Sequence, residues 1–227
     1  MSQNSRERIL TRIRSAVTDI PAPRKVSRAY LTRHIQNESQ VALDLLHENL
    51  ADYRAHVRRT GVVGLPALLA ELLDEQNART VVEPTGLPPE WLARVRGERV
   101  PDTVLAPDAL DAVDAVVTGC ALAVAETGTI VLDGGPGQGP RALTLVPDLH
   151  VCVVQEDQVV ASVPEALPRL DPRRPLTWIS GPSATSDIEL DRVEGVHGPR
   201  RLHVVIVTDH EQSEISRSVP RDSPARR

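Results

Sequence analysis

Residues 114–139 read DAVVTGCALAVAETGTIVLDGGPGQG, a stretch in which two apolar runs flank a glycine and a third precedes a glycine-rich loop. The runs at 115–118 and 129–132 have the length and the β-branched content of short strands. Upstream of them the periodicity predicts helices at 66–76 and 90–96, with a strand at 80–82 between them. This alternation of strand and helix predicts an α/β fold with an open, mainly parallel sheet and flanking helices.

The second half of the chain continues the pattern. Apolar strands are predicted at 149–154, 176–180 and 202–207, with a helical turn at 164–170. There is no Phe, so the core has to be built from Val, Leu, Ile and Ala. A chain of 227 residues can enclose one sizeable core with additions. We assign that α/β domain to residues 61–208.

The first sixty residues are expected to form a helical extension, 1–60. Ser5 is a plausible N-cap, and Ile9 and Ile13 follow at helical spacing, so a short amphipathic helix is predicted before Pro21 and Pro23. A longer helix is predicted from Glu38 to about Arg59. Its apolar stripe would consist of Val41, Leu45, Tyr53 and Val57.

Charge and composition exclude several classes of protein. A net charge of -5 argues against non-specific binding to nucleic acid. No apolar run approaches the ~18 residues of a membrane span, and no signal peptide is recognisable, so a cytoplasmic protein is expected. Cys120 and Cys152 lack the CxxC spacing of zinc or cluster ligands and are expected to be buried thiols. The polar tail at 209–227 is expected to be disordered.

The glycine-rich loop is a candidate binding site for an anion. Five glycines lie within the twelve residues 128–139, and consecutive exposed amides of such a loop can bind a phosphate or a carboxylate. No Gly-Lys-Ser/Thr follows, and Pro136 interrupts a GxGxxG pattern, so neither nucleotide motif applies. The alternative is a wide hairpin or a bulged turn. The candidate ligand-binding residues of the loop are Gly134, Gly135 and Gly137.

A polar run at 180–189 follows the predicted strand 176–180, and the carboxyl ends of strands are where open α/β sheets bind ligands. Its hydroxyls could donate to an anion, and Asp187 could act as an acid or base, or alternatively cap a helix or turn. The candidate ligand-binding residues here are Ser180, Gly181, Ser183, Thr185 and Glu189.

Glu126 is the other candidate catalytic residue. Small residues flank it, so its carboxylate could approach a substrate closely as nucleophile or base. It could equally orient a ligand or bind backbone amides in a structural role. Its neighbours Thr127, Gly128 and Thr129 are assigned to ligand binding with it. His197, within GVHGP at 195–199, could ligate, shuttle protons or fill a turn.

Four ordered motifs resemble the LUD-domain family: VTGCALAVAETGT at 117–129, LVPDLH at 145–150, SGPSATSDIE at 180–189 and GVHGP at 195–199. The resemblance spans roughly 114–207. It implies a fold similar to the NagB/RpiA/CoA-transferase group. It also implies a part in the oxidation of L-lactate to pyruvate beside two partners that carry iron–sulfur motifs. This chain would then be the subunit without a cluster and would bind no cofactor of its own.

Three functions therefore stay open. The first is a non-cluster subunit of an L-lactate-oxidising complex that binds a small anionic metabolite. The second is a stand-alone enzyme for a phosphosugar, a folate or a CoA-linked metabolite, with Glu126 or Asp187 as base. The third is a regulatory or scaffold module whose glycine loop is only structural.

Overall fold

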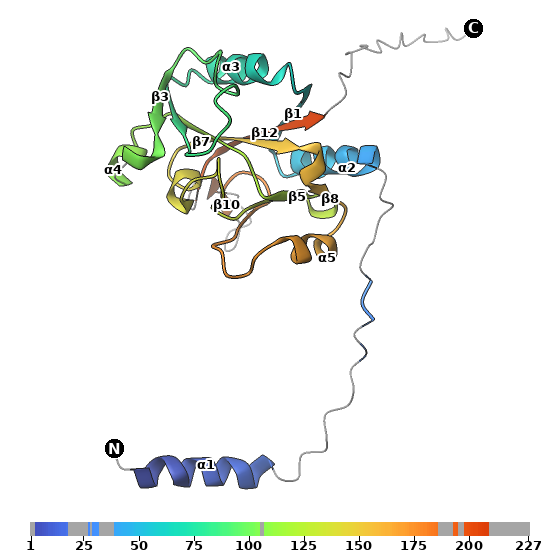
Figure 1. Ribbon diagram of the computed structural model, residues 1–227, viewed down its shortest axis with the longest axis vertical. Helices are drawn as coiled ribbons and strands as arrows, with labels where there is room; N and C mark the ends of the chain where they lie inside the picture. The colour runs from blue at the N-terminus through green and yellow to red at the C-terminus, as the bar shows by residue number, and fades with distance from the viewer. Residues whose placement is uncertain are drawn as a thin grey trace, which may run out of the picture. The chain divides into compact units, whose positions relative to one another are not determined.

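A computed structural model describes residues 3–17, 27, 29–31, 39–104, 107–185, 193–194 and 198–208. The chain forms two units, residues 1–31 and 32–227, and each is described by itself (Figure 1). The first unit contains α1 (Gln3–Val17), which is the predicted N-terminal helix and begins two residues before Ser5. Its Ile9, Ile13 and Val17 are exposed. No described helix is long and apolar enough to cross a membrane.

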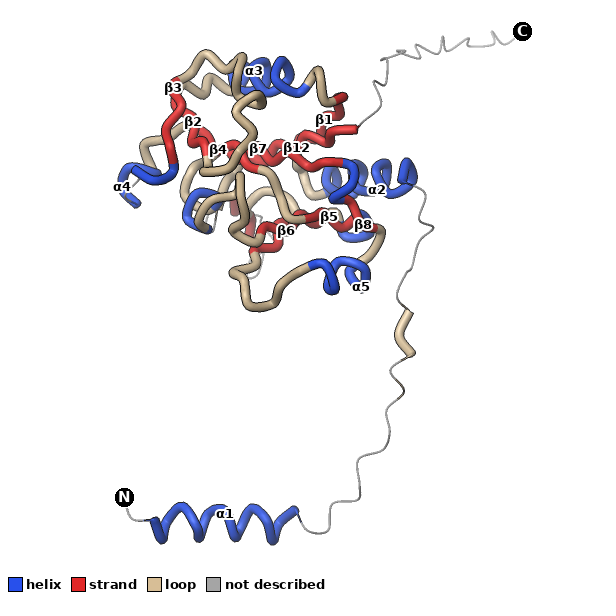
Figure 2. Tube along the Cα trace, viewed as in Figure 1, coloured by secondary structure: helices blue, strands red, loops and turns tan. Residues whose placement is uncertain are grey.

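The second unit is built on a six-stranded sheet in which every neighbouring pair is parallel (Figure 2). This confirms the predicted α/β class and the mainly parallel sheet. In spatial order the strands are β1 (His56–Gly61), β12 (Arg201–Thr208), β7 (Leu149–Gln155), β4 (Ala115–Thr118), β2 (Thr80–Glu83) and β3 (Glu98–Pro101). The central strands are buried on both faces, as expected for parallel strands covered on both sides.

One face of the sheet is covered by α3 (Leu65–Glu75), which matches the helix predicted at 66–76 (Figure 1). Its buried side chains recur at helical spacing, and Pro66 in the first turn needs no amide donor. The helix packs together with Trp91 against β7 and β12. The members of this core cluster from α3 are Leu65, Leu69, Leu72 and Leu73.

The other face is covered by a second, four-stranded sheet and by α2 (Ser39–Asp52) (Figure 2). Its strand order is β8 (Val159–Val160), β5 (Leu122–Val124), β6 (Thr129–Leu132) and β9 (Thr177–Ile179). Strand β6 is antiparallel to both of its neighbours. Two of the strands predicted from sequence, 129–132 and 176–180, therefore lie outside the parallel sheet.

Short elements complete the unit. The outer face of the second sheet packs on α5, where the sequence predicted a helical turn at 164–170. The short helices are α4 (Pro107–Leu110), α5 (Val163–Ala166), η1 (Asp102–Val104), η2 (Ala125–Thr127), η3 (Arg141–Thr144), η4 (Glu156–Gln158) and η5 (Leu167–Arg169). Strands β10 (Ala184–Thr185) and β11 (Val193–Glu194) form a separate antiparallel pair.

The helix predicted at 38–59 is wrong in its second half. It ends at Asp52, Arg54 takes a φ of 68°, and residues 56–61 form edge strand β1 paired with β12. The buried stripe of α2 is also displaced by one or two positions from the predicted one, because Val41 and Tyr53 are exposed. The buried residues are Ala42, Leu43, Leu46 and Leu50. Since α2 and β1 pack within this unit, it begins before residue 61.

The helix predicted at 90–96 is also wrong. The segment consists of tight turns, in which the amide of Trp91 donates to the carbonyl of Pro88 and that of Val95 to Leu92. Trp91 and Leu92 are both buried in the α3 core cluster, so tertiary packing fixes the segment without a continuous helix. The predicted tail at 209–227 lies outside the described residues.

Candidate functional site

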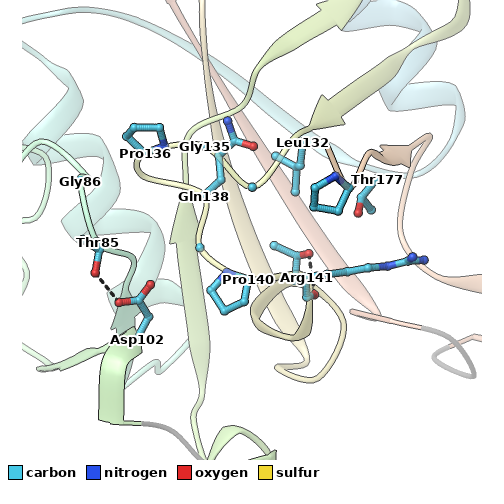
Figure 3. Close-up of a pocket in the computed structure, with 14 residues that line it drawn as sticks. Thr85, Gly86, Asp102, Leu132, Gly135, Pro136, Gln138, Pro140, Arg141 and Thr177 are labelled. Atoms are coloured by element: carbon cyan, nitrogen blue, oxygen red, sulfur yellow. Dashed lines mark hydrogen bonds between the residues drawn. The ribbon is translucent and has the colours of Figure 1, made fainter. Parts of the chain in front are cut away.

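The larger of the two adjoining cavities, about 600 Å³, lies at the carboxyl ends of β2 and β3 (Figure 3). We call it the glycine-loop cavity. Thr85, Gly86 and Asp102 form one side, where these strands end, and Gly134 and Gly135 come from the loop after β6. Its other lining residues are Leu132, Pro136, Gln138, Gly139, Pro140, Arg141, Thr144, Pro175 and Thr177. The cavity therefore stands where the strand-end rule places ligands.

Most backbone amides of the glycine loop already donate hydrogen bonds to other groups of the protein. The amide of Gly137 donates to Thr85 O at 2.9 Å, and its carbonyl accepts from Gly119 N at 2.9 Å. The amide of Gly135 donates to the carboxylate of Asp133 at 3.0 Å. Gly86 approaches Pro136 so closely that an added Cβ would lie 2.9 Å from the proline Cβ. Gly134 and Gly135 thus line the cavity, whereas Gly137 ties the loop to the neighbouring strand ends.

Arg141 supplies the free positive charge of this cavity. It begins η3 directly after the glycine loop, and its carbonyl accepts a hydrogen bond from the hydroxyl of Thr144. Its side chain is exposed, and its guanidinium forms no hydrogen bond or ion pair with the residues that the structure describes. Figure 3 shows its side chain extending towards Thr177, on the side of the cavity opposite Thr85 and Asp102. Asp102 accepts a hydrogen bond from Thr85 at 2.7 Å. Arg141 is therefore the group best placed to attract an anion.

A second cavity of about 300 Å³ shares Arg141, Thr144 and Thr177 with the first. We call it the His150 cavity. Ser180 and Ser183 contribute hydroxyls to its wall. Its other lining residues are Leu145, His150, Trp178, Ile179, Gly181, Pro182, Gly198, Pro199 and Leu202. The two cavities therefore adjoin each other, with Arg141 in the wall of both, and we refer to the pair as the two-cavity hollow.

His150 is the buried titratable group of this hollow. Its side chain stands on β7 next to the end of β4, where Nε2 lies 2.8 Å from the hydroxyl of Thr118. The residue is 1% exposed, and this burial lowers the pKa of His150 to about 4. The ring is therefore neutral at physiological pH. The sequence interpretation gave this histidine no site role; its one signal was its place within the LVPDLH motif.

Glu126 lies in a turn that holds two helices. Its Oε1 accepts the amide of Val163, the first residue of α5, at 2.9 Å. The following Gly128 has a φ of 56°, and a Cβ there would lie 2.8 Å from atoms of Asn49 on α2. Asn49 in turn donates to the carbonyl of Ala125 at 2.8 Å. Neither Glu126 nor Gly128 lines either cavity, so their assignment to catalysis and ligand binding stays a prediction.

A chain of hydroxyls joins two of the predicted segments. Thr127 donates to the hydroxyl of Thr129 at 2.8 Å, and Thr129 is 2.8 Å from the hydroxyl of Ser180. Of these three, Ser180 lines the His150 cavity. The structure therefore brings the turn at 125–129 and the run after β9 together, with Ser180 as the member that faces a cavity.

The remaining predicted residues divide into two groups. Gly181 and Ser183 line the His150 cavity, and the amide of Ser183 donates to Pro199 O at 2.8 Å. Thr185 belongs to β10, and its side chain is not described. Asp187, Glu189 and His197 lie outside the described residues. The residues that sequence reasoning missed are Thr85, Asp102, Arg141, Thr144, His150 and Thr177.

Both cysteines are buried and free. A hydrogen bond with Cys152, together with burial, raises the pKa of the Cys120 thiol well above its ordinary value. A thiol in this state is a poor nucleophile, and the burial of both cysteines agrees with the expectation of buried thiols. Within the described ranges, His, Cys, Asp and Glu form no group of three or more that could hold a metal ion.

Comparisons with known proteins place the chain among its relatives. A family model of the LUD domain matches residues 98–207, which run from β3 to β12. "Lactate utilization protein C" of Deinococcus radiodurans is 44% identical over 85% of this chain and 86% of its own length. The protein of the same name from Halalkalibacterium halodurans is 27% identical over 77% of this chain and 82% of its own. A crystal structure of a DUF162 family protein from D. radiodurans shares 41% identity and a TM-score of 0.65, covering 76% of this chain and 99% of that one.

Proposed function

This chain belongs to the LUD-domain family, and from that premise we propose that it serves in L-lactate utilisation, as the cluster-free subunit of a system that oxidises L-lactate to pyruvate. The proposal is supported by one observation above all. A relative named lactate utilization protein C is 44% identical to this chain over 86% of the relative's length. Location in the cytoplasm belongs to the same proposal.

The electrons released by the reaction explain why partner proteins are needed. Oxidation of L-lactate to pyruvate releases two electrons and two protons, and the electrons need an acceptor. Cys120 and Cys152 are the only cysteines of the chain, fewer than the four thiolates of a common iron–sulfur cluster. The electrons would therefore pass to clusters in two iron–sulfur partner subunits, and this chain would contribute binding and orientation.

The part assigned to this chain is to hold a small organic anion in the two-cavity hollow. Arg141 offers a guanidinium without a partner in the described structure, and arginine suits carboxylates because it can donate two parallel hydrogen bonds. Hydroxyls of Thr144, Thr177 and Ser180 surround the same space. These groups support binding of an anion more directly than the glycine amides do, since the amides of Gly135 and Gly137 already donate to Asp133 and Thr85.

Growth on L-lactate tests the proposal. In a host whose other L-lactate dehydrogenases have been removed, deletion of this gene should abolish growth on L-lactate and leave growth on pyruvate intact. The wild-type gene should restore growth, Arg141→Gln should not, and Arg173→Gln is the matched control because Arg173 is 89% exposed and pairs with Asp171. Undiminished growth of the deletion strain on L-lactate would refute the role.

The partners are tested separately. A tagged copy of the chain, purified without oxygen from cells growing on L-lactate, should bring two iron–sulfur proteins with it in fixed ratio. The matched control is a purification from cells growing on pyruvate. Recovery of the chain alone under both conditions would contradict the partner part of the proposal.

A second candidate function is a stand-alone enzyme for a phosphosugar, a folate or a CoA-linked metabolite. The observation in its favour is the glycine-loop cavity, whose volume of about 600 Å³ is typical of sites for ligands much larger than a three-carbon acid. A thermal-shift panel with coenzyme A, ribose 5-phosphate and folate tests it. A ligand at 100 times its Kd should stabilise the chain by about 2.7 kcal/mol, and turnover without partner proteins would favour this function.

A further inference from the structure

His150 has unused hydrogen-bonding capacity that faces a cavity. The side chain is 1% exposed and lines the His150 cavity. Within the described structure its ring forms one hydrogen bond, between Nε2 and Thr118, and Nδ1 has no protein partner. Nδ1 is not one of the fully enclosed unpaired atoms of the described structure, so this unpaired nitrogen is open to the cavity that His150 lines. Because polar atoms of buried residues usually have a hydrogen-bond partner, an open nitrogen at a cavity wall is a position for a ligand or a solvent molecule.

The protonation state and the tautomer of the His150 ring decide which ligand group it can bind. Burial lowers the pKa of His150 to about 4, so the imidazole is uncharged and does not serve as a counter-ion for an anion. If Thr118 donates to Nε2, then Nδ1 carries the proton and donates; if Nε2 donates to Thr118, then Nδ1 accepts. The same nitrogen can thus bind a carbonyl oxygen in one tautomer and a hydroxyl group in either.

The remainder of the wall supplies the complementary charge. Arg141 lies at the junction of the two cavities, and no carboxylate side chain is among the described residues that line the His150 cavity. Ser180 and Ser183 add hydroxyls, while Leu145 and Trp178 give apolar surface. A small molecule with one negative charge and a neighbouring uncharged oxygen matches this set.

We propose that the His150 cavity binds α-hydroxy and α-oxo monocarboxylates, with the carboxylate at Arg141 and the α-oxygen at Nδ1 of His150. The volume of about 300 Å³ suits a small acid better than the larger neighbouring cavity does. The inference deepens the proposed function and rests on it for the choice of L-lactate and pyruvate as probes. It assigns His150 to binding and invokes no electron transfer within this chain.

Titration of the purified full-length chain tests the inference. L-lactate and pyruvate should bind about tenfold more tightly than propionate, which has the carboxylate and lacks the α-oxygen. His150→Leu should remove that preference and leave propionate binding unchanged. The matched control is His56→Gln, which removes an exposed histidine that lines neither cavity and should keep the preference.

A second readout does not depend on the variant folding. In ¹⁵N NMR spectra of the wild-type chain, L-lactate should shift the ring nitrogen signals of His150, and propionate should not. Equal affinity for L-lactate and propionate, or L-lactate binding that leaves these signals unmoved, would overturn the inference. A chain that is required for growth on L-lactate yet binds neither acid would overturn the inference alone, whereas selective binding without a growth defect would overturn the lactate-utilisation role alone.

Discussion

The turn at 125–129 and the wall around His150 both carry polar side chains, but these side chains differ in where their hydrogen bonds go. The carboxylate of Glu126 is bonded to α5, and the glycine after it lets α2 approach. His150 and Arg141 keep donors or acceptors without partners in the described structure, and both face a cavity. A conspicuous sequence motif can thus serve to stabilise the fold, while less conspicuous residues keep the free hydrogen-bonding groups that a ligand needs.

The largest loss of stability is expected from a substitution that disrupts the turn at 125–129. Gly128→Val should lower the free energy of unfolding by about 4 kcal/mol, because a β-branched residue is strained at a φ of 56° and its Cβ would lie 2.8 Å from Asn49. Urea denaturation measures this loss. The matched control is Gly134→Ala, at a φ of 65° with the nearest atom 3.7 Å away, which should cost about 1 kcal/mol. Equal losses in the two variants would show that α2 does not depend on the turn.

Acid should lower the free energy of unfolding, because it protonates the buried His150 in the cavity wall. Because the folded-state pKa of His150 is about 4, below its ordinary value near 6.5, the unfolded chain binds the proton more readily. The contribution of His150 is fully present above pH ~6.5 and is lost as the pH falls towards 4, by about 3 kcal/mol in all.

His203, which is also buried, has its pKa lowered to about 4 by burial and by its neighbours His56, Arg58 and Arg201, and adds a similar loss. Unfolding free energies of the wild type and of His150→Leu between pH 7 and pH 4 isolate the His150 part. An identical pH dependence in the two proteins would show that His150 is charged or exposed in the folded state.

Two substitutions of Glu126, with smaller expected effects on stability, distinguish a structural role of its carboxylate from a catalytic one. Glu126→Ala should cost about 1 to 2 kcal/mol of stability, because the amide of Val163 at the start of α5 loses its acceptor. Glu126→Gln keeps an acceptor oxygen and should be nearly as stable as the wild type. L-lactate-dependent growth should also survive Glu126→Gln. If Glu126→Gln abolishes growth and keeps the stability of the wild type, the carboxylate has a chemical role. The turn at 125–129 would then not be purely structural.

Much of the fold could be predicted from sequence, because buried parallel strands such as 149–154 are continuous apolar runs. Strand β1 could not, since HVRRTG at 56–61 has neither strand alternation nor an apolar run and is held by its pairing with β12. The second sheet was also missed, because an apolar run such as 129–132 looks the same in either kind of sheet. Pairing partners are a property of the whole chain.

The candidate site was predictable in position more than in residues. The strand-end rule points to Asp102, but the strand before it reads ERVP, with two charges and a proline, and gave no strand signal. Ser180, Gly181 and Ser183 were found because an apolar strand precedes them. The importance of His150 rests on burial and on an open Nδ1, and neither is visible until β4 and β7 are paired.

We assign ligand binding to the wall formed by Arg141 and His150 and not to the turn at Glu126. Titration of L-lactate against the wild type, Arg141→Gln and Glu126→Gln distinguishes these two regions. We expect Glu126→Gln to bind L-lactate like the wild type and Arg141→Gln to bind it at least about tenfold more weakly, since a charge-assisted hydrogen bond is lost. Loss of binding in Glu126→Gln with full binding in Arg141→Gln would contradict this assignment.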